Sequence, residues 1–199
     1  MIETVLGYFE MGGYPIMTPI FLCSVFALAI ILEKFLTLRT NHVIQPRMVD
    51  RIKKDLASGK IVDAIRICQT QNSPMSRIIL AGLEATPSNA RNRILDEGKL
   101  EAARLERYLT SLGTIANISP LLGLLGTVSG MIKVFFTINQ QGLGQSQAMA
   151  GGISEALITT AFGLIVAIPA LAAYNYFDAK VQHLVTHMEK NASDIAGML

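Results

Sequence analysis

The sequence is most informative where charge is missing. Only 16% of its 199 residues are charged, and residues 11–32, 108–132 and 156–177 contain no Lys, Arg, Asp or Glu. These stretches hold 22, 25 and 22 residues, and a helix needs roughly 20 apolar residues to cross a bilayer core. A soluble domain would spread its charges over its whole surface. The chain is therefore predicted to be an all-α, polytopic membrane protein with three transmembrane helices.

Motifs of enzymes and cofactor sites are also missing. There is no GK[ST] sequence, and Gln147 stands where a GxGxxG motif beginning at Gly142 needs its last glycine. His183 and His187 have the i, i+4 spacing of a metal pair, but residue 184 is Leu, so the HExxH zinc motif is absent. No Ser/His/Asp or Cys/His set suggests a nucleophile. We expect no enzyme activity, no cofactor and no metal.

No basic residue precedes the first span, and the charged residues before it are Glu3 and Glu10. A cleaved signal peptide needs a positive n-region, so none is expected. Of the two cysteines, Cys23 falls within the first span and Cys68 in the segment after it, which makes a disulfide implausible. A formal net charge of +2 is too small to indicate a nucleic-acid partner.

The distribution of Lys and Arg predicts the orientation in the membrane. Residues 39–107 carry 13 of the 17 basic residues, whereas the arm before the first span and the loop at 139–150 carry none. Basic residues near the spans mark the cytoplasmic side. The N-terminus is therefore predicted to lie outside and the C-terminus in the cytoplasm.

Seven segments follow from these observations. They are an external N-terminal arm (1–14), transmembrane helix 1 (15–38), a small cytoplasmic helical domain (39–111), transmembrane helix 2 (112–138), a periplasmic loop (139–148), transmembrane helix 3 (149–177) and a cytoplasmic C-terminal helix (178–199).

Prolines mark short helices in the predicted cytoplasmic domain. Pro46 can open one, and Ser73-Pro74 is an N-cap followed by a proline at the first helical position. From Asn89 the pattern is helical, and we expect one straight helix from the cytoplasm into the second span. The third span is apolar as far as Phe177, longer than the bilayer is thick, so long helices should extend into the cytoplasm.

The second and third spans carry small residues at four-residue spacing. Such faces let helices approach closely in lipid. One interpretation is a tight hairpin within one chain, but two small faces per hairpin favour a homo-oligomer. The candidate helix-packing residues are Gly123, Gly126, Gly130, Gly163, Pro120 and Pro169.

Counting outward from Gly144, the middle of the loop, predicts which residues share a level. Thr127 lies 17 residues before it and Thr160 lies 16 after it, while Lys133 and Glu155 are each 11 away. The threonines should lie deep in the membrane, as pore residues or bonded to their own helix. Lys133 and Glu155 should lie nearer the outer face, paired with one another or reaching the headgroups.

Two segments resemble a known family. SPLLGLLGTVSGMIKVF at 119–135 and GGISEALITTAFGLIVAIPALAAYNYF at 151–177 are similar to the second-span and third-span signatures of the MotA/TolQ/ExbB proton-channel family, and the three spans are typical of its ExbB/TolQ branch. The resemblance implies a homopentamer that encloses the membrane helices of two copies of a single-span ExbD- or TolR-like protein, each with a membrane Asp.

The resemblance also implies residue roles. The pore threonines of the family fall on Thr127 and Thr160 and its membrane glutamate on Glu155, while Lys133 stands where related proteins carry Asn or His. Lys133 and Thr159 are further candidates for the pore or for a charge partner. A threonine hydroxyl can orient a proton but cannot store one, so a second polypeptide must supply the acid that carries it.

The function that the resemblance implies is a proton-channel stator subunit of a motor driven by the proton-motive force. An ExbB-like subunit would energise TonB-dependent outer-membrane transport, with a TonB- or TolA-like protein as a further partner. A TolQ-like role in envelope maintenance, or another specialised motor, is the alternative within the family. A non-conducting membrane scaffold, in which the threonines only pack, is the alternative of a different class.

Overall fold

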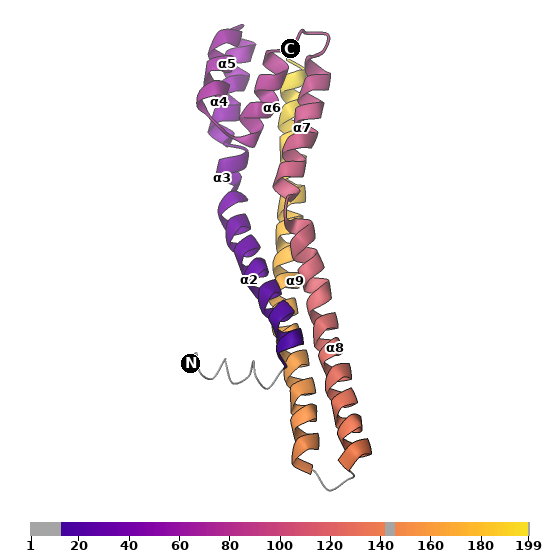
Figure 1. The fold of residues 1–199 in the computed structure, drawn as a ribbon. Helices are drawn as coiled ribbons and strands as arrows, with labels where there is room; N and C mark the ends of the chain where they lie inside the picture. The colour runs from indigo at the N-terminus through magenta and orange to yellow at the C-terminus, as the bar shows by residue number, and fades with distance from the viewer. Residues whose placement is uncertain (1–12, 142–145, 199) are drawn as a thin grey trace. The chain divides into compact units, whose positions relative to one another are not determined.

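The computed structural model describes residues 13–141 and 146–198, and within them the chain is helical and contains no strand (Figure 1). The all-α prediction is confirmed. Residues 1–12 of the predicted arm and residues 142–145 of the predicted loop lie outside the described residues. The helices are α2 (Tyr14–Thr37), α3 (Thr40–Val43), α4 (Pro46–Ala57), α5 (Ile61–Thr70), α6 (Pro74–Leu83), α7 (Ala90–Glu106), α8 (Leu109–Gln141) and α9 (Ser146–Ala196).

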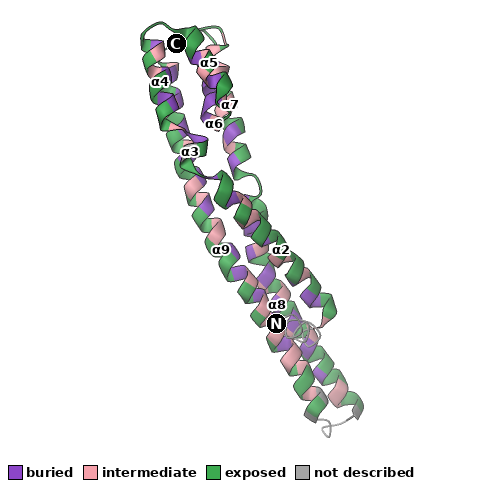
Figure 2. Cartoon of the chain, turned by 90° about the vertical axis from the view of Figure 1, so that its left-hand side faces the viewer, coloured by how far each residue is buried: buried purple, intermediate pink, exposed green. Residues whose placement is uncertain are grey.

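Three helical stretches are long and apolar enough to cross a membrane. They are Tyr14–Thr37, Ala90–Gln140 and Met149–Ala196, with mean hydropathies of 2.4, 1.8 and 2.2 in their most apolar windows. Only 22%, 22% and 28% of these windows are buried within the chain, and exposed residues run along α2, α8 and α9 (Figure 2). So much exposed apolar surface is unstable in water, so the chain is a multi-pass membrane protein.

The chain divides into two compact units. The first, called here the hairpin unit, comprises Met1–Leu32 and Tyr108–Asn175. The second, the bundle unit, comprises Glu33–Arg107 and Tyr176–Leu199. The hairpin unit contains most of α2, all of α8 and the first part of α9, whereas the bundle unit contains the shorter helices and the end of α9.

The bundle unit has its own apolar core. Helix α4 turns the apolar side chains at its i, i+4 and i+8 positions inward: Met48, Ile52 and Leu56 are buried. Helix α6 begins as its sequence predicts, because the Ser73 hydroxyl accepts a hydrogen bond of 3.1 Å from the Ser76 backbone N–H. The Ser76 hydroxyl in turn accepts from the Ser73 N–H at 3.0 Å, which completes a reciprocal cap.

The expectation of one straight helix from Asn89 into the second span is wrong. Helix α7 ends at Glu106 and α8 begins at Leu109, and Tyr108 between them has a φ of +67°. The buried ammonium of Lys34 donates a hydrogen bond of 3.1 Å to the Leu105 carbonyl. Carbonyls in the last turn of a helix lack partners within it, so this lysine stabilises the end of α7. Lys34 is 71 positions away from Leu105 in the sequence, so the local pattern cannot reveal this contact.

A buried ion pair joins α6 to α7. Arg77 donates to both carboxylate oxygens of Glu101 at 2.7 Å, and the Glu101 side chain is 1% exposed. Arg104 also contacts this carboxylate from one turn along α7. Hydrogen bonding to Glu101 raises the pKa of the Arg77 guanidinium, so this group keeps its positive charge.

Replacing Arg77 with Met should destabilise the bundle unit, because it leaves the buried carboxylate with Arg104 alone. Because Arg104 still contacts the carboxylate, the loss costs about 1.5 kcal/mol, or roughly tenfold in the local unfolding equilibrium. Cys68 reports that equilibrium, since it is buried and burial raises the pKa of its thiol to about 11. Maleimide labelling at pH 7 in a Cys23→Ser background should accelerate by that factor.

Arg66→Met, a change at an exposed residue of α5, is the matched control and should leave the labelling rate unchanged. Equal acceleration in both variants would show that the Arg77–Glu101 pair does not stabilise the unit.

Candidate functional site

Helices α8 and α9 approach so closely that their contact points require glycine. A Cβ atom added at Gly126 would lie 2.1 Å from the Thr159 hydroxyl oxygen, and one added at Gly163 would lie 2.7 Å from the Ser119 carbonyl oxygen. At Gly130 the same atom would lie 2.7 Å from the Gly152 carbonyl oxygen. No real Cβ contacts are this short, so the small residues set the distance between the helices.

The remaining candidate packing residues differ in how far they are buried. Gly123 lies in the same interface, where an added Cβ would be 3.0 Å from the Thr160 Cα. Pro120 is half-buried and Pro169 is exposed. Among the described residues, none covers Pro169.

The two candidate pore threonines lie close to the contact between α8 and α9. Thr160 donates a hydrogen bond of 2.9 Å across the interface to the Gly123 carbonyl. Thr127 lies four residues beyond Gly123, about 6 Å along the helix axis, and donates at 2.7 Å to the Leu124 carbonyl of its own helix. Both are half-buried, so each hydroxyl oxygen retains lone pairs that can accept a further hydrogen bond.

Thr159, the other candidate threonine, occupies a different environment. It is fully buried under Gly126, and its hydroxyl donates to the Glu155 and Ala156 carbonyls of its own helix at 2.9 and 3.0 Å. Thr159 and Thr160 are adjacent in the sequence of the third span. In the structure both pack against α8, with Thr159 enclosed and Thr160 at the margin.

Lys133 and Glu155 form a direct ion pair between the two helices. The Lys133 ammonium lies 2.5 Å from the Glu155 carboxylate, in agreement with the equal distance of both residues from the middle of the loop. The Lys133 side chain is 55% exposed and that of Glu155 only 15%. These are the only residues with formal charge among the described residues of the hairpin unit, and their charges cancel.

Gly13 lies against the Glu155 carboxylate, a contact that the sequence did not reveal. A Cβ added at Gly13 would lie 2.2 Å from the Glu155 Oε1 atom, and its φ of +75° suits only glycine well. The Gly13 carbonyl accepts the first hydrogen bonds of α2, from the backbone N–H groups of Ile16 and Met17. The Glu155 carboxylate therefore lies near both the Lys133 ammonium and the N-terminus of α2, and a helix N-terminus attracts negative charge.

The geometry defines a class of protein: a multi-pass membrane protein with a tightly packed helical hairpin. The hairpin carries threonine hydroxyl groups near the middle of its two helices and an ion pair of zero net charge nearer the loop. Residues 70–190 match the MotA/TolQ/ExbB proton channel family. The chain belongs to this family.

Three curated relatives have names that contain the term ExbB. The chain is 33% identical over 172 residues to the "Putative biopolymer transport protein ExbB-like 3" of Synechocystis sp., which covers 84% of this chain and 82% of the relative. It is 37% identical over 176 residues to "ExbB-like 1" of the same organism, covering 85% and 68%. It is 32% identical over 154 residues to "Biopolymer transport protein ExbB" of Xanthomonas campestris, covering 67% and 61%.

Replacing Gly126 with Ala should destabilise the hairpin, because the new methyl group would overlap the enclosed Thr159 side chain. Overpacking of this kind costs about 1–3 kcal/mol. Gly151→Ala is the matched control, since nothing lies within 4 Å of a Cβ at that position. The thermal aggregation midpoint in detergent should fall for Gly126→Ala only, and a similar midpoint in both variants would show that the close approach is not required.

Proposed function

We propose that this protein is an ExbB-like proton-channel stator subunit that works as a homopentamer in the bacterial inner membrane. Five hairpins would surround the membrane helices of two copies of a single-span, ExbD- or TolR-like partner, each bearing a membrane Asp. The N-terminus would be periplasmic, and the bundle unit and the C-terminus cytoplasmic. The observation that carries the proposal is the placement of Thr127 and Thr160 in a hairpin where Glu155, the only acid among its described residues, is already paired.

The hydroxyl groups suit proton passage beside an acid supplied by another protein. Each donates its proton to a backbone carbonyl, so its oxygen is left to accept a hydrogen bond. A protonated carboxylic acid is such a donor, whereas the ionised form is only an acceptor. The two threonines therefore favour the neutral form of a partner's Asp that passes them.

Glu155 and Lys133 are suited to the outer end of the pathway. Their mutual pairing and the α2 N-terminus keep the carboxylate fixed and compensated. An acid held in this way does not travel with a proton to the cytoplasmic side, so the mobile acid comes from the partner. Thr159, enclosed between α8 and α9, acts in packing.

Each transferred proton delivers enough energy to drive a stepwise motion. A membrane potential contributes about 2.3 kcal/mol per 100 mV, and a pH gradient contributes about 1.4 kcal/mol per unit. Protonation would neutralise the partner's Asp and let its helix pass the apolar wall, and release would restore the charge. Five subunits around two helices give a symmetry mismatch that favours rotation, which a TonB- or TolA-like protein would transmit.

Two alternative functions can be distinguished from the proposed one by experiment. A TolQ-like role in envelope maintenance, or another specialised motor of the family, uses the same site with a different partner. A non-conducting scaffold, which like the motor requires no enzymatic chemistry, would give no proton flux with any single-span partner. Coexpression with a neighbouring single-span protein that carries a membrane Asp, followed by flux measurement in vesicles, distinguishes these functions.

Thr127→Val and Thr160→Val should each lower partner-dependent proton flux at least tenfold while the complex still assembles, because valine keeps the shape and removes the hydroxyl. Thr18→Val is the matched control, since Thr18 is an exposed residue of α2 that donates to the Tyr14 carbonyl of its own helix. Flux is measured with a pH-sensitive dye in proteoliposomes. Full flux in either hairpin variant would refute the role of these hydroxyls.

Lys133 and Glu155 should behave as a coupled pair. Lys133→Met leaves an uncompensated carboxylate and Glu155→Gln an uncompensated ammonium, so each lowers the thermal stability of the detergent-solubilised complex. The double variant should recover most of the loss, with a coupling energy of roughly 0.5–3 kcal/mol, as for other residues in contact. Additive losses would mean that the two charges act independently.

A further inference from the structure

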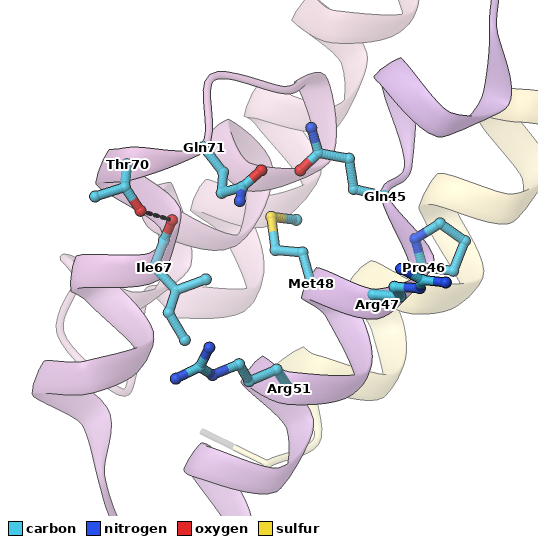
Figure 3. Close-up of a pocket in the computed structure, with 8 residues that line it drawn as sticks. All are labelled: Gln45, Pro46, Arg47, Met48, Arg51, Ile67, Thr70 and Gln71. Carbon is cyan, nitrogen blue, oxygen red and sulfur yellow. Dashed lines mark hydrogen bonds between the residues drawn. The ribbon is translucent and has the colours of Figure 1, made fainter.

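A groove of about 340 Å³ lies in the bundle unit, between α7 and the end of α9 (Figure 1). Its floor is apolar and includes the buried side chains of Ile94, Met188 and Ala192. The hollow between α4 and α5 is larger, at about 730 Å³, but it is lined by arginine, glutamine and threonine side chains that water solvates well (Figure 3). Of these two hollows, the groove beside α7 gains more from being covered by another apolar surface.

Gly98 keeps this groove open. It lies inside α7 and lines the groove, and a Cβ atom added there would meet nothing within 4 Å. Glycine inside a helix lowers the stability of that helix relative to alanine. No contact among the described residues offsets this loss, because no neighbour approaches the position closely. A glycine of this kind in an apolar groove favours close approach by another molecule.

Helix α7 is too highly charged to lie in lipid. Eight of its 17 residues are Lys, Arg, Asp or Glu, and charged side chains are costly inside a bilayer. Two of its leucines are nevertheless exposed: Leu95, which lines the groove, by 52%, and Leu100 by 54%. Apolar surface that is exposed to water around a groove is typical of a contact with another protein.

Leu100, called here the knob, lies on the opposite side of α7 from the groove. It follows Gly98 by two residues, and at 3.6 residues per turn the two directions differ by about 160°. A knob and a groove on opposite sides of one helix cannot meet within one chain. They can meet between successive copies of the chain that are arranged head to tail.

The knob and the groove also lie at the same height. In a ring around the membrane normal, each residue has the same height in every copy. The groove extends from Arg91 to Ala102 along α7, and Leu100 falls within this range. The knob of one copy can therefore enter the groove of the next without any shift along the membrane normal.

The charges on the two sides of this contact are complementary. The groove is lined by Arg91, Lys99 and Glu189. Asp96 and Arg93 precede the knob by four and seven residues, so they share its side of α7. All five are exposed, and none forms an ion pair among the described residues. Asp96 can therefore meet the two basic groups of the next copy, and Arg93 can meet its Glu189.

We propose that the groove between α7 and α9 receives Leu100 of a second copy of this chain, so that the bundle units join head to tail. This contact rests on the proposed function for the ring of five, and it gives the bundle unit an interface of its own. The free apolar surface on both sides of α7 and the unpaired charges around it are then all used in one contact.

Disulfide cross-linking of the full-length protein in its membrane tests the contact. Gly98→Cys and Leu100→Cys are combined in a chain whose own cysteines are replaced by Cys23→Ser and Cys68→Ala. A mild oxidant should link each copy to the next, because the two sulfur atoms come within bonding distance only between copies. Products of increasing size should form and end at five copies. Neither single variant should form them, since its one cysteine faces no second cysteine.

Two matched controls belong to this test. Val62→Cys combined with Leu100→Cys should give no such series, because Val62 is 80% exposed on α5 and lies outside the groove. Gly98→Leu should raise the fraction of monomer in native mass spectrometry roughly tenfold, since it fills the groove. Asn92→Leu, the same new side chain at an exposed residue of α7 outside the groove, should leave that fraction unchanged.

Products of two copies only, equal cross-linking by the Val62 pair, or an unchanged monomer fraction in Gly98→Leu would overturn the proposal. Partner-dependent proton flux separates this outcome from that of the proposed function. A series of five copies without flux supports the contact and contradicts the motor, and a series that ends at another number supports the contact and contradicts the pentamer. Flux without any series contradicts the contact alone.

Discussion

The structure depends on the close approach of α8 and α9 in a medium that offers no water. Inside a bilayer each polar group needs a partner within the protein. Gly126, Gly130 and Gly163 bring the two backbones together, and this distance lets the Thr160 hydroxyl reach the Gly123 carbonyl. The same distance lets Lys133 reach Glu155. The polar contacts of the hairpin thus depend on the short distance between the helices that the glycines allow.

The same constraint explains why the proposed conduit needs a second protein. Charges that are compensated within one chain are stable but immobile, as the Glu155 carboxylate is beside Lys133 and the start of α2. Hydroxyl groups add polarity at mid-height but hold no exchangeable charge near neutral pH. In the proposed motor, such a chain would provide a fixed polar track, and the acid that moves along it would belong to a neighbour.

Much of the fold follows from local sequence features. Gaps in charge identify the apolar helices, the Ser73-Pro74 pair identifies the start of α6, and symmetric counting from the loop identifies the Lys133–Glu155 pair. Each of these signals rests on residues near one another in the chain or on a simple hairpin geometry.

What the sequence did not reveal depends on contacts between distant residues. The break after α7 is accompanied by the buried Lys34, which reads as a flanking charge at the end of the first span. Nothing in the sequence marks Gly13 as important, and its role is apparent only from its contact with Glu155. Thr159 and Thr160 are neighbours of the same type, and only the position of Gly126 determines which of them is enclosed.

The central claim is that the hydroxyls of Thr127 and Thr160 face a space occupied by an acidic helix of another protein. A cryo-electron microscopy structure of the assembled complex in lipid nanodiscs tests it most directly. The account predicts a ring of five hairpins with both side chains turned toward two central helices, and an Asp of those helices at the level of the threonines. A ring without foreign helices, or threonines turned toward lipid, would contradict it.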